Sequence, residues 1–316
     1  MPVWGYIIVA TVVVLGAGLW LAARWLFRLA LYRHSDKMIV LRNLKIPKDP
    51  SADDLSLPYS AASMGRWREN LGGEDVFRRA PDGTTLHAVV AEQPGSGDRW
   101  AVVMHGYTMR HPLSIYAKHF HDASWNLLVP TQRGHGQSGG DYITMGWQDR
   151  LDLVDWIAWL IERHPEAKMV LHGVSMGGST ALMAAGELLP GNVRCVISDC
   201  AFSTARDQFA HQLKLFFKLP AFPLLDVALL QAKLVAGIDI RQADAVAQVR
   251  KSRLPMLFIH GGKDRFVPAW MQDVLYEAAP GHREKLCVEE AEHGMSTYLE
   301  PELYWGTVWN FIEKVL

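Results

Sequence analysis

Short apolar segments that alternate with helix-length stretches constrain the fold of this chain more than any other feature of its sequence. The segments read WAVVMHG, NLLVPTQ, KMVLHGVS, VRCVISD, LPMLFIHGG and EKLCVEEAEHG. Val, Leu and Ile follow one another in them with little polar alternation, which is typical of strands that are buried on both faces of a parallel sheet. The sequence therefore predicts an α/β fold, with a mostly parallel sheet flanked by helices.

Two local patterns agree with this architecture. The turn at Pro81-Asp82-Gly83 lies between two extended runs and predicts a β-hairpin, because proline presets φ and glycine accepts a positive φ. The stretch 146–164 has the length of a crossover helix and ends before Pro165. Its apolar residues at helical spacing predict the face that packs on the sheet. They are Leu151, Val154, Ile157, Ala158 and Ile161.

The N-terminal segment from Val3 to Ala23 contains 21 consecutive positions without a charge. As a helix it would be roughly 31 Å long at about 1.5 Å per residue, which is enough to cross a bilayer. No Lys or Arg precedes the run, as one would in a cleavable signal peptide, and Arg24 follows it. We therefore expect residues 1–24 to be a retained transmembrane anchor rather than a buried core helix.

Basic residues gather on the C-terminal side of this segment. They are Arg24, Arg28, Arg33, Lys37, Arg42 and Lys45. The positive-inside rule then predicts a single-pass membrane protein with its large domain on the cytoplasmic side, although long domains can be translocated despite flanking charge. Residues 25–70 are expected to be a juxtamembrane linker, since the stretch 46–73 is rich in Pro, Ser, Asp and Gly. One domain should follow, over residues 71–316.

The charge balance and the cysteines exclude some classes of function. Lys and Arg number 32 against 33 Asp and Glu, so no net positive charge attracts a nucleic acid. The three cysteines, Cys195, Cys200 and Cys287, have spacings that fit neither a disulfide framework nor a zinc site. We expect them to be small buried hydrophobic residues.

The segment Gly173-Val174-Ser175-Met176-Gly177 follows an apolar strand and precedes an Ala-rich helix. In such a strand–turn–helix the central serine has a strained backbone that holds its hydroxyl above the sheet. Glycines flank it because strand and helix nearly touch, and the helix N-terminus favours developing negative charge. Ser175 is therefore the predicted nucleophile.

A serine hydroxyl needs a base, and the base needs a carboxylate that orients it. Asp264 lies in the loop after LPMLFIHGG, and His293 follows the last strand. The order Ser175, Asp264, His293 is the one expected for a serine on this kind of turn. Asp199, at the end of VRCVISD, is the alternative carboxylate.

With these residues the chain resembles the α/β-hydrolase superfamily from about Glu74 to Leu316. Besides the serine turn and the two later loops, it has His105-Gly106 after one strand and Arg133-Gly134-His135-Gly136-x-Ser138 after the next. The resemblance implies a serine hydrolase with a cap, similar to membrane-anchored esterase or lipase-like members and to serine-peptidase-like members. It also implies that His105 shapes its loop. His172 and His260, which precede glycines, are interpreted as structural histidines too.

A serine hydrolase also needs donors for the oxyanion of its tetrahedral intermediate. The backbone N–H of Met176 is the first donor, because it follows the nucleophile. The resemblance implies that the backbone N–H of Tyr107 is the second. We further hypothesise that the Tyr107 hydroxyl lines the pocket.

More than fifty residues separate VRCVISD from LPMLFIHGG, far more than a crossover helix needs. An insertion at about 203–250 is predicted to form a small helical cap over an apolar acyl pocket. Its apolar side chains include Phe209, Leu213, Phe216, Phe217, Phe222, Leu224 and Leu225. The alternatives are that they pack on the sheet, or that they touch the membrane and admit lipid-borne substrate.

Together these features predict an enzyme that cleaves carboxylic esters through an acyl-enzyme intermediate. We expect a small-molecule ester or lipid-like substrate, and neither a metal nor a cofactor. The same residues would also serve an amide or peptide hydrolase. A catalytically silent membrane-bound interaction module is the alternative from another class, since a fold alone does not confer activity.

Overall fold

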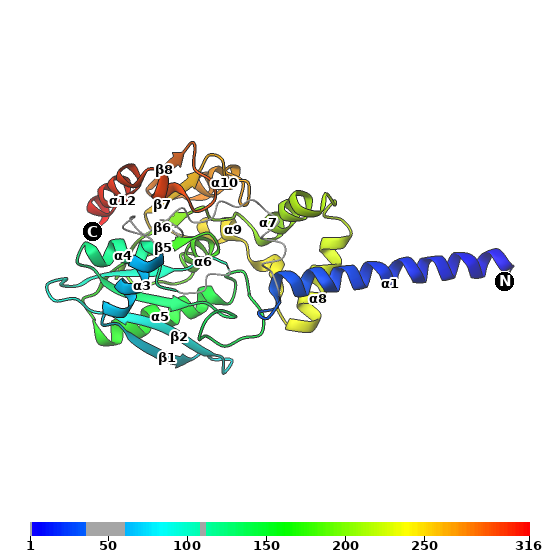
Figure 1. Cartoon of the computed structure of the whole chain (residues 1–316), viewed down its shortest axis with the longest axis horizontal. Coiled ribbons are helices and arrows are strands. Elements are labelled where there is room, and N and C mark those ends of the chain that lie inside the picture. Colours follow the sequence, from blue (N-terminus) through cyan, green and yellow to red (C-terminus); the bar gives the residue numbers. More distant parts are fainter. Residues whose placement is uncertain (1, 36–60, 108–111) are drawn as a thin grey trace.

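An eight-stranded sheet in the order β1-β2-β4-β3-β5-β6-β7-β8 organises the structure (Figure 1). The computed structural model describes residues 2–35, 61–107 and 112–316. The strands are β1 (Glu74–Arg79), β2 (Thr85–Ala91), β3 (Arg99–Met104), β4 (Asn126–Thr131), β5 (Lys168–Val174), β6 (Val193–Asp199), β7 (Met256–Gly261) and β8 (Arg283–Val288). Strand β2 is antiparallel to both of its neighbours, and the remaining pairs are parallel. The predicted α/β sheet and its first hairpin are thus confirmed.

Helices cover both faces of this sheet. The helices in the described residues, including those outside these layers, are α1 (Val3–Leu31), α3 (Ala61–Asn70), α4 (Ile115–Asp122), α5 (Asp149–Arg163), α6 (Met176–Ala184), α7 (Ala205–Gln212), η1 (Leu213–Phe217), α8 (Leu224–Ala236), η2 (Ile240–Gln242), α9 (Ala245–Val249), α10 (Trp270–Ala278), α11 (Ser296–Leu299) and α12 (Pro301–Val315). Helices α4 and α12 bury Phe120 and Phe311 on one face, and α5, α6 and α10 bury Trp156, Leu182 and Met271 on the other. Between β6 and β7, helices α7, η1 and α8 form a small cap next to α1, whereas α9 packs against α6 and α10.

The predicted buried face of the 146–164 helix is wrong at two of its five positions. In α5, Leu151 is 47% exposed and Ala158 is exposed as well. Ile157 is buried as predicted and Val154 and Ile161 are half-buried, while the other buried apolar residues are Leu153, Trp156, Trp159 and Leu160. Electrostatics explains the rotation, because Arg133 donates to both carboxylate oxygens of Asp152, at 2.6 and 2.7 Å. The helix must turn Asp152 inward to make this pair.

Helix α1 is longer than the predicted anchor and ends at Leu31. Its first part projects away from the body of the protein, and its last turns lie beside α8 (Figure 1). By length and composition it is a candidate membrane span. Within the predicted linker, α3 occupies residues 61–70, whereas residues 36–60, including Lys37, Arg42 and Lys45, lie outside the described part of the chain.

The cysteines follow the prediction only in part. All three are free, and Cys195 and Cys200 are buried, but Cys287 is exposed. The difference has a simple cause, because Cys287 lies on the edge strand β8, which has a neighbouring strand on one side alone.

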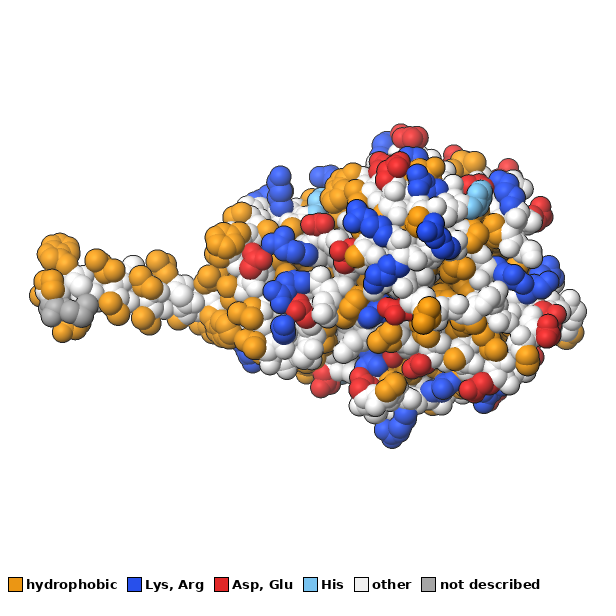
Figure 2. Space-filling model, turned by 180° about the vertical axis from the view of Figure 1, so that it is seen from behind, with side chains coloured by type: hydrophobic (Ala, Val, Ile, Leu, Met, Phe, Trp, Pro, Cys, Tyr) orange, Lys and Arg blue, Asp and Glu red, His pale blue; other side chains and the backbone are white. Residues whose placement is uncertain are grey.

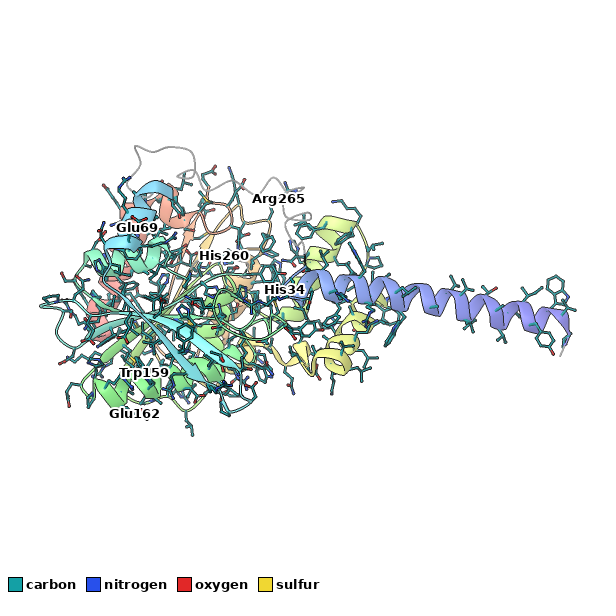
Figure 3. The ribbon with its side chains drawn as sticks, turned by 60° about the horizontal axis from the view of Figure 1, so that its bottom comes forward. His34, Glu69, Trp159, Glu162, His260 and Arg265 are labelled. Carbon is teal, nitrogen blue, oxygen red and sulfur yellow. The ribbon has the colours of Figure 1, made fainter. Side chains whose placement is uncertain are left out.

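The buried pair between Arg133 and Asp152 gives a first prediction. We expect Asp152→Ala to lower the free energy of unfolding by about 3 kcal/mol, because it removes a carboxylate from a buried guanidinium. Denaturant unfolding of the detergent-solubilised protein measures this change. Glu162→Ala is the matched control, since that side chain lies at the outer surface of α5 (Figure 3) and is 71% exposed. Equal losses in the two variants would contradict the assignment.

Candidate active site

Ser175 lies in a sharp turn between β5 and α6. Its φ of 54° and ψ of −120° are unusual for a non-glycine residue, as expected for a serine held above a sheet. The adjoining backbone is too crowded for side chains. A Cβ at Gly177 would lie 2.3 Å from the carbonyl oxygen of Met104 and 2.5 Å from that of His105, and one at Gly173 would lie 2.2 Å from the Gly177 oxygen. The glycines therefore allow α6 to pack against the end of β3.

The structure brings the three predicted catalytic residues into one chain of hydrogen bonds. The Oγ atom of Ser175 is 3.0 Å from Nε2 of His293, and Nδ1 of His293 is 2.6 Å from Oδ2 of Asp264. Asp264 follows β7 and His293 follows β8, so both loops start at the edge of the sheet where β5 delivers Ser175. Such an arrangement can move a proton from the hydroxyl to the ring while the carboxylate orients that ring.

The carboxylate of Asp264 is held at both oxygens. Oδ1 accepts the backbone N–H groups of Phe266 and Val267 at 2.9 and 2.8 Å. Oδ2 lies 3.3 Å from Nε2 of His260 in addition to its bond with His293. Burial alone would raise the pKa of Asp264, but these two histidines and their hydrogen bonds hold it well below its usual range. The group is therefore an anion throughout the neutral pH range.

The contact from His260 was not anticipated, although the sequence carries a hint of it. The ring is buried, and its Nε2 atom also lies 2.9 Å from the carbonyl oxygen of Val267. Burial opposes a charge on this ring, yet Asp264 raises the pKa of His260 overall. The signal was the spacing of four residues between His260 and Asp264 across a two-glycine turn.

Asp199, the alternative carboxylate, has a different neighbour. It is fully buried, and its Oδ2 accepts the hydroxyl of Tyr116 at 2.9 Å. Burial raises the pKa of Asp199. The Nδ1 atom of His293 is bonded to Asp264 instead, so Asp199 does not orient the imidazole.

His105 and His172, which the sequence predicted to be structural, are buried in the fold. Nε2 of His105 accepts the backbone N–H of Gln132 at 2.9 Å, and its Nδ1 lies 2.8 Å from the carbonyl oxygen of Gly106. His172 is hydrogen-bonded through Nε2 to the Tyr304 hydroxyl at 3.1 Å. Burial lowers the pKa of each ring to about 3. Both rings are neutral and support their surroundings.

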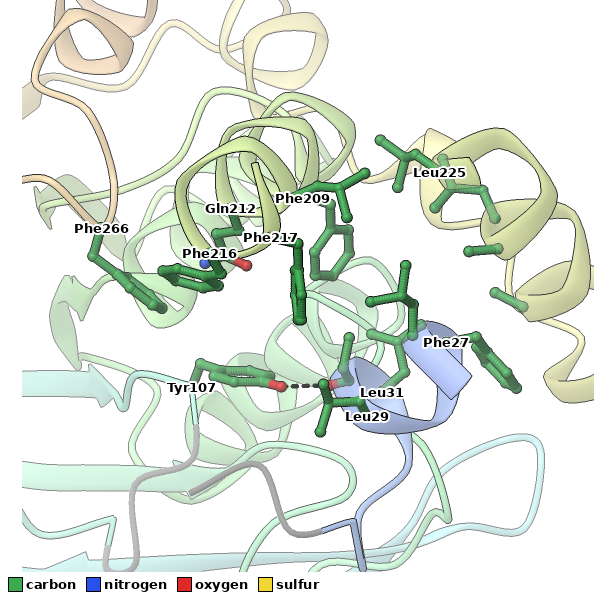
Figure 4. A pocket seen from close by; sticks show the side chains of 16 residues that line it. Phe27, Leu29, Leu31, Tyr107, Phe209, Gln212, Phe216, Phe217, Leu225 and Phe266 are labelled. Carbon is green, nitrogen blue, oxygen red and sulfur yellow. Dashed lines mark hydrogen bonds between the residues drawn. The ribbon is translucent and has the colours of Figure 1, made fainter. Parts of the chain in front are cut away.

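Tyr107 and Met176, the predicted oxyanion donors, line one small pocket with Ser175. Met176 begins α6, where backbone N–H groups have no partner within the helix. The Tyr107 hydroxyl does not point at the nucleophile. It donates to the carbonyl oxygen of Ala30 in the last turn of α1 (Figure 4), and burial raises its pKa, so it keeps this proton.

One group of side chains in the described residues has the composition of a metal site. Potential ligand atoms of Cys200, Asp264 and His293 lie within 4.8 Å of one another. The two ring nitrogens of His293 are already engaged by Asp264 and Ser175, and the Cys200 sulfur lies 4.0 Å from Nε2. A metal ion would have to break the hydrogen-bonded chain described above, so the group fits proton transfer better than metal binding.

Comparison with known proteins gives concordant findings. A family model described as alpha/beta hydrolase fold matches residues 102–229. The chain is 33% identical over 216 residues to the uncharacterized protein YqkD of Bacillus subtilis (strain 168), covering 68% of this chain and 71% of that protein. The structure of the present chain is similar to that of esterase Pf2001 of Pyrococcus furiosus. The TM-score is 0.63 at 23% identity, and the match covers 79% of this chain and 94% of the esterase chain. The structure is also similar to an acylaminoacyl peptidase of Pyrococcus horikoshii, with a TM-score of 0.60, 17% identity, and coverage of 80% and 43%. At these identities the two structural likenesses show the fold alone.

The two carboxylates give a second prediction. Asp264→Asn should lower kcat by about 10³- to 10⁴-fold, because an amide that donates to His293 favours the wrong tautomer. Asp199→Asn should lower kcat by less than about tenfold, since an amide oxygen can still accept from Tyr116. Steady-state turnover of a short p-nitrophenyl ester by both variants provides the measurement. Loss of turnover in the Asp199 variant alone would reverse the assignment.

Proposed function

The chain belongs to the α/β-hydrolase superfamily, and we propose that it is a serine hydrolase that cleaves carboxylic esters through an acyl-enzyme intermediate. The observation that carries this proposal is the unbroken chain of hydrogen bonds from Ser175 Oγ through His293 to Asp264. The esterase and peptidase folds similar to it support a hydrolase. Ester cleavage is the finer part of the proposal.

The proposed reaction begins with attack of Ser175 Oγ on the ester carbonyl carbon. Nε2 of His293 accepts the hydroxyl proton, and Asp264 stabilises the imidazolium that forms. The backbone N–H groups of Tyr107 and Met176 donate to the oxyanion, which strengthens their hydrogen bonds as charge develops. His293 then protonates the leaving alcohol, and a water molecule activated by the same ring hydrolyses the acyl-enzyme.

The surroundings of the nucleophile favour an apolar acyl group. Most of the side chains that line the small pocket beside Ser175 are apolar, among them Met145, Phe202 and Phe266, and the amides of Gln208 and Gln212 line it as well. The predominantly apolar walls offer dispersion contacts, so they suit a hydrocarbon chain better than a polar peptide. For this reason a small-molecule ester or lipid-like substrate is preferred over an amide or peptide.

A third prediction tests the nucleophile. The wild-type protein should react covalently with a fluorophosphonate probe, and Ser175→Ala should lose both this labelling and at least about 10³-fold of ester turnover. Gel fluorescence and mass spectrometry of the labelled peptide report the site of reaction. Ser124→Ala is the matched control, because Ser124 is exposed before β4, at the opposite end of the sheet.

The same assay separates the alternatives. A silent interaction module would show no labelling of the wild-type protein. An amide hydrolase would be labelled but would turn over p-nitroanilides at least as well as the matched p-nitrophenyl esters. Either result would replace the esterase proposal.

We place the enzyme on a membrane through α1, with the catalytic domain on the cytoplasmic side. The apolar helix and the basic residues Arg24, Arg28 and Arg33 that follow its projecting part support this orientation. In sealed right-side-out vesicles, external protease should therefore leave the domain intact, and digestion should require detergent. Digestion in intact vesicles would invert the orientation without affecting the proposed chemistry.

A further inference from the structure

A second, larger cavity lies between the end of α1 and the cap (Figure 4). It contains about 830 Å³ of space, part of it open to solvent. Leu29 and Ala30 of α1 line one side, and Phe217 and Ala228 of the cap line the other. Of the sixteen side chains around it, only Tyr107 and Gln212 are polar. The cavity therefore suits a hydrocarbon ligand.

Helix α1 is a fixed wall of this cavity, because its last turns are folded into the protein. Phe27 and Leu31 are 3% and 2% exposed. The buried side chain of Gln231 in α8 donates to the carbonyl oxygen of Trp20 at 2.8 Å, and Tyr107 donates to that of Ala30. These two bonds fix the helix to the cap on one side and to the predicted oxyanion loop on the other.

The cavity lies directly beside the small pocket around the nucleophile. Four residues line both spaces, namely Tyr107, Phe209, Gln212 and Phe266. The ring of Phe266 also lies 4.9 Å from that of His293. An acyl chain that extends from a carbonyl at Ser175 and passes between these four side chains would therefore reach α1.

The outer surface beside this cavity is apolar as well. Figure 2 shows hydrophobic side chains gathered where the projecting helix meets the body of the protein. The cap also has exposed apolar residues, among them Phe222 at 76% and Leu234 at 66% exposure. This surface adjoins the candidate membrane span, so a bilayer is the environment that would cover it.

From these observations we infer that the cavity binds the acyl chain of a lipid ester that enters from the bilayer along α1. The anchor then has two functions, because its last two turns form a wall of the acyl site and limit the length and width of the chain. This inference rests on the proposed ester hydrolysis for its chemistry, but the binding of the chain can be measured separately.

Three matched Ala→Phe variants of the full-length protein test the inference. Ala30 and Ala228 line the cavity from α1 and α8, whereas Ala22 is exposed on α1 outside it. The ratio of kcat/KM for p-nitrophenyl dodecanoate to that for the acetate should fall by at least about tenfold in Ala30→Phe and Ala228→Phe. A benzyl group in the cavity displaces two or more methylene groups of the long chain. Ala22→Phe should keep the wild-type ratio.

A binding measurement separates the failure of this inference from the failure of the proposed function. In the Ser175→Ala background, a fluorescent fatty acid should bind, and its Kd should rise at least about tenfold on adding Ala30→Phe but not Ala22→Phe. Fluorophosphonate labelling of the variants with Ser175 intact shows that their sites are folded. An unchanged ratio in both Ala30→Phe and Ala228→Phe, together with an unchanged Kd on adding Ala30→Phe, would overturn the acyl site. Absent labelling of the wild type would overturn only the chemistry.

Discussion

The close approach of α6 to the end of β3 is the constraint on which the site depends. No side chain fits at Gly177, because a Cβ there would overlap the carbonyl oxygens of Met104 and His105. This contact places the N-terminus of α6 directly beside the loop that carries Tyr107. It also forces Ser175 into its unusual backbone conformation, so the same crowding exposes the hydroxyl and brings the two predicted oxyanion donors together.

Buried charges then fix the loops around this turn. Asp264 accepts two backbone N–H groups and contacts two imidazoles, so the carboxylate stays ionised although little water reaches it. In the loop after β4, Arg133 is paired with Asp152 and with Asp82. Each charge has partners in place before any substrate arrives, which is the arrangement that makes an electrostatic environment effective in catalysis.

The sequence sufficed for the features that depend on local chemistry. The order of strands and helices, the hairpin, and the meeting of Ser175, His293 and Asp264 all follow from segment patterns and loop positions. Contacts between distant segments could not be predicted from the sequence. The inward face of α5 depends on a partner in another loop, and the bond from Tyr107 to Ala30 joins residues 77 positions apart. Neither of these two contacts produces a periodic pattern of residues in the segments that make it.

The continuity of α1 has a consequence for how the enzyme would sit on a surface. One uninterrupted helix runs from Val3 to Leu31, and Arg33 follows it with hydrogen bonds to the carbonyl oxygens of Gly136 and Ser138. In the described residues, no break in the helix separates the projecting part of α1 from the part that is packed against the cap. Each residue turns a helix by about 100°. Inserting one residue between Ala10 and Trp20 would therefore rotate the projecting N-terminal part of α1 by that angle relative to the folded domain. If α1 spans a bilayer as proposed, helical phase as well as helix length would therefore set which side of its projecting part faces the lipids nearest the cap.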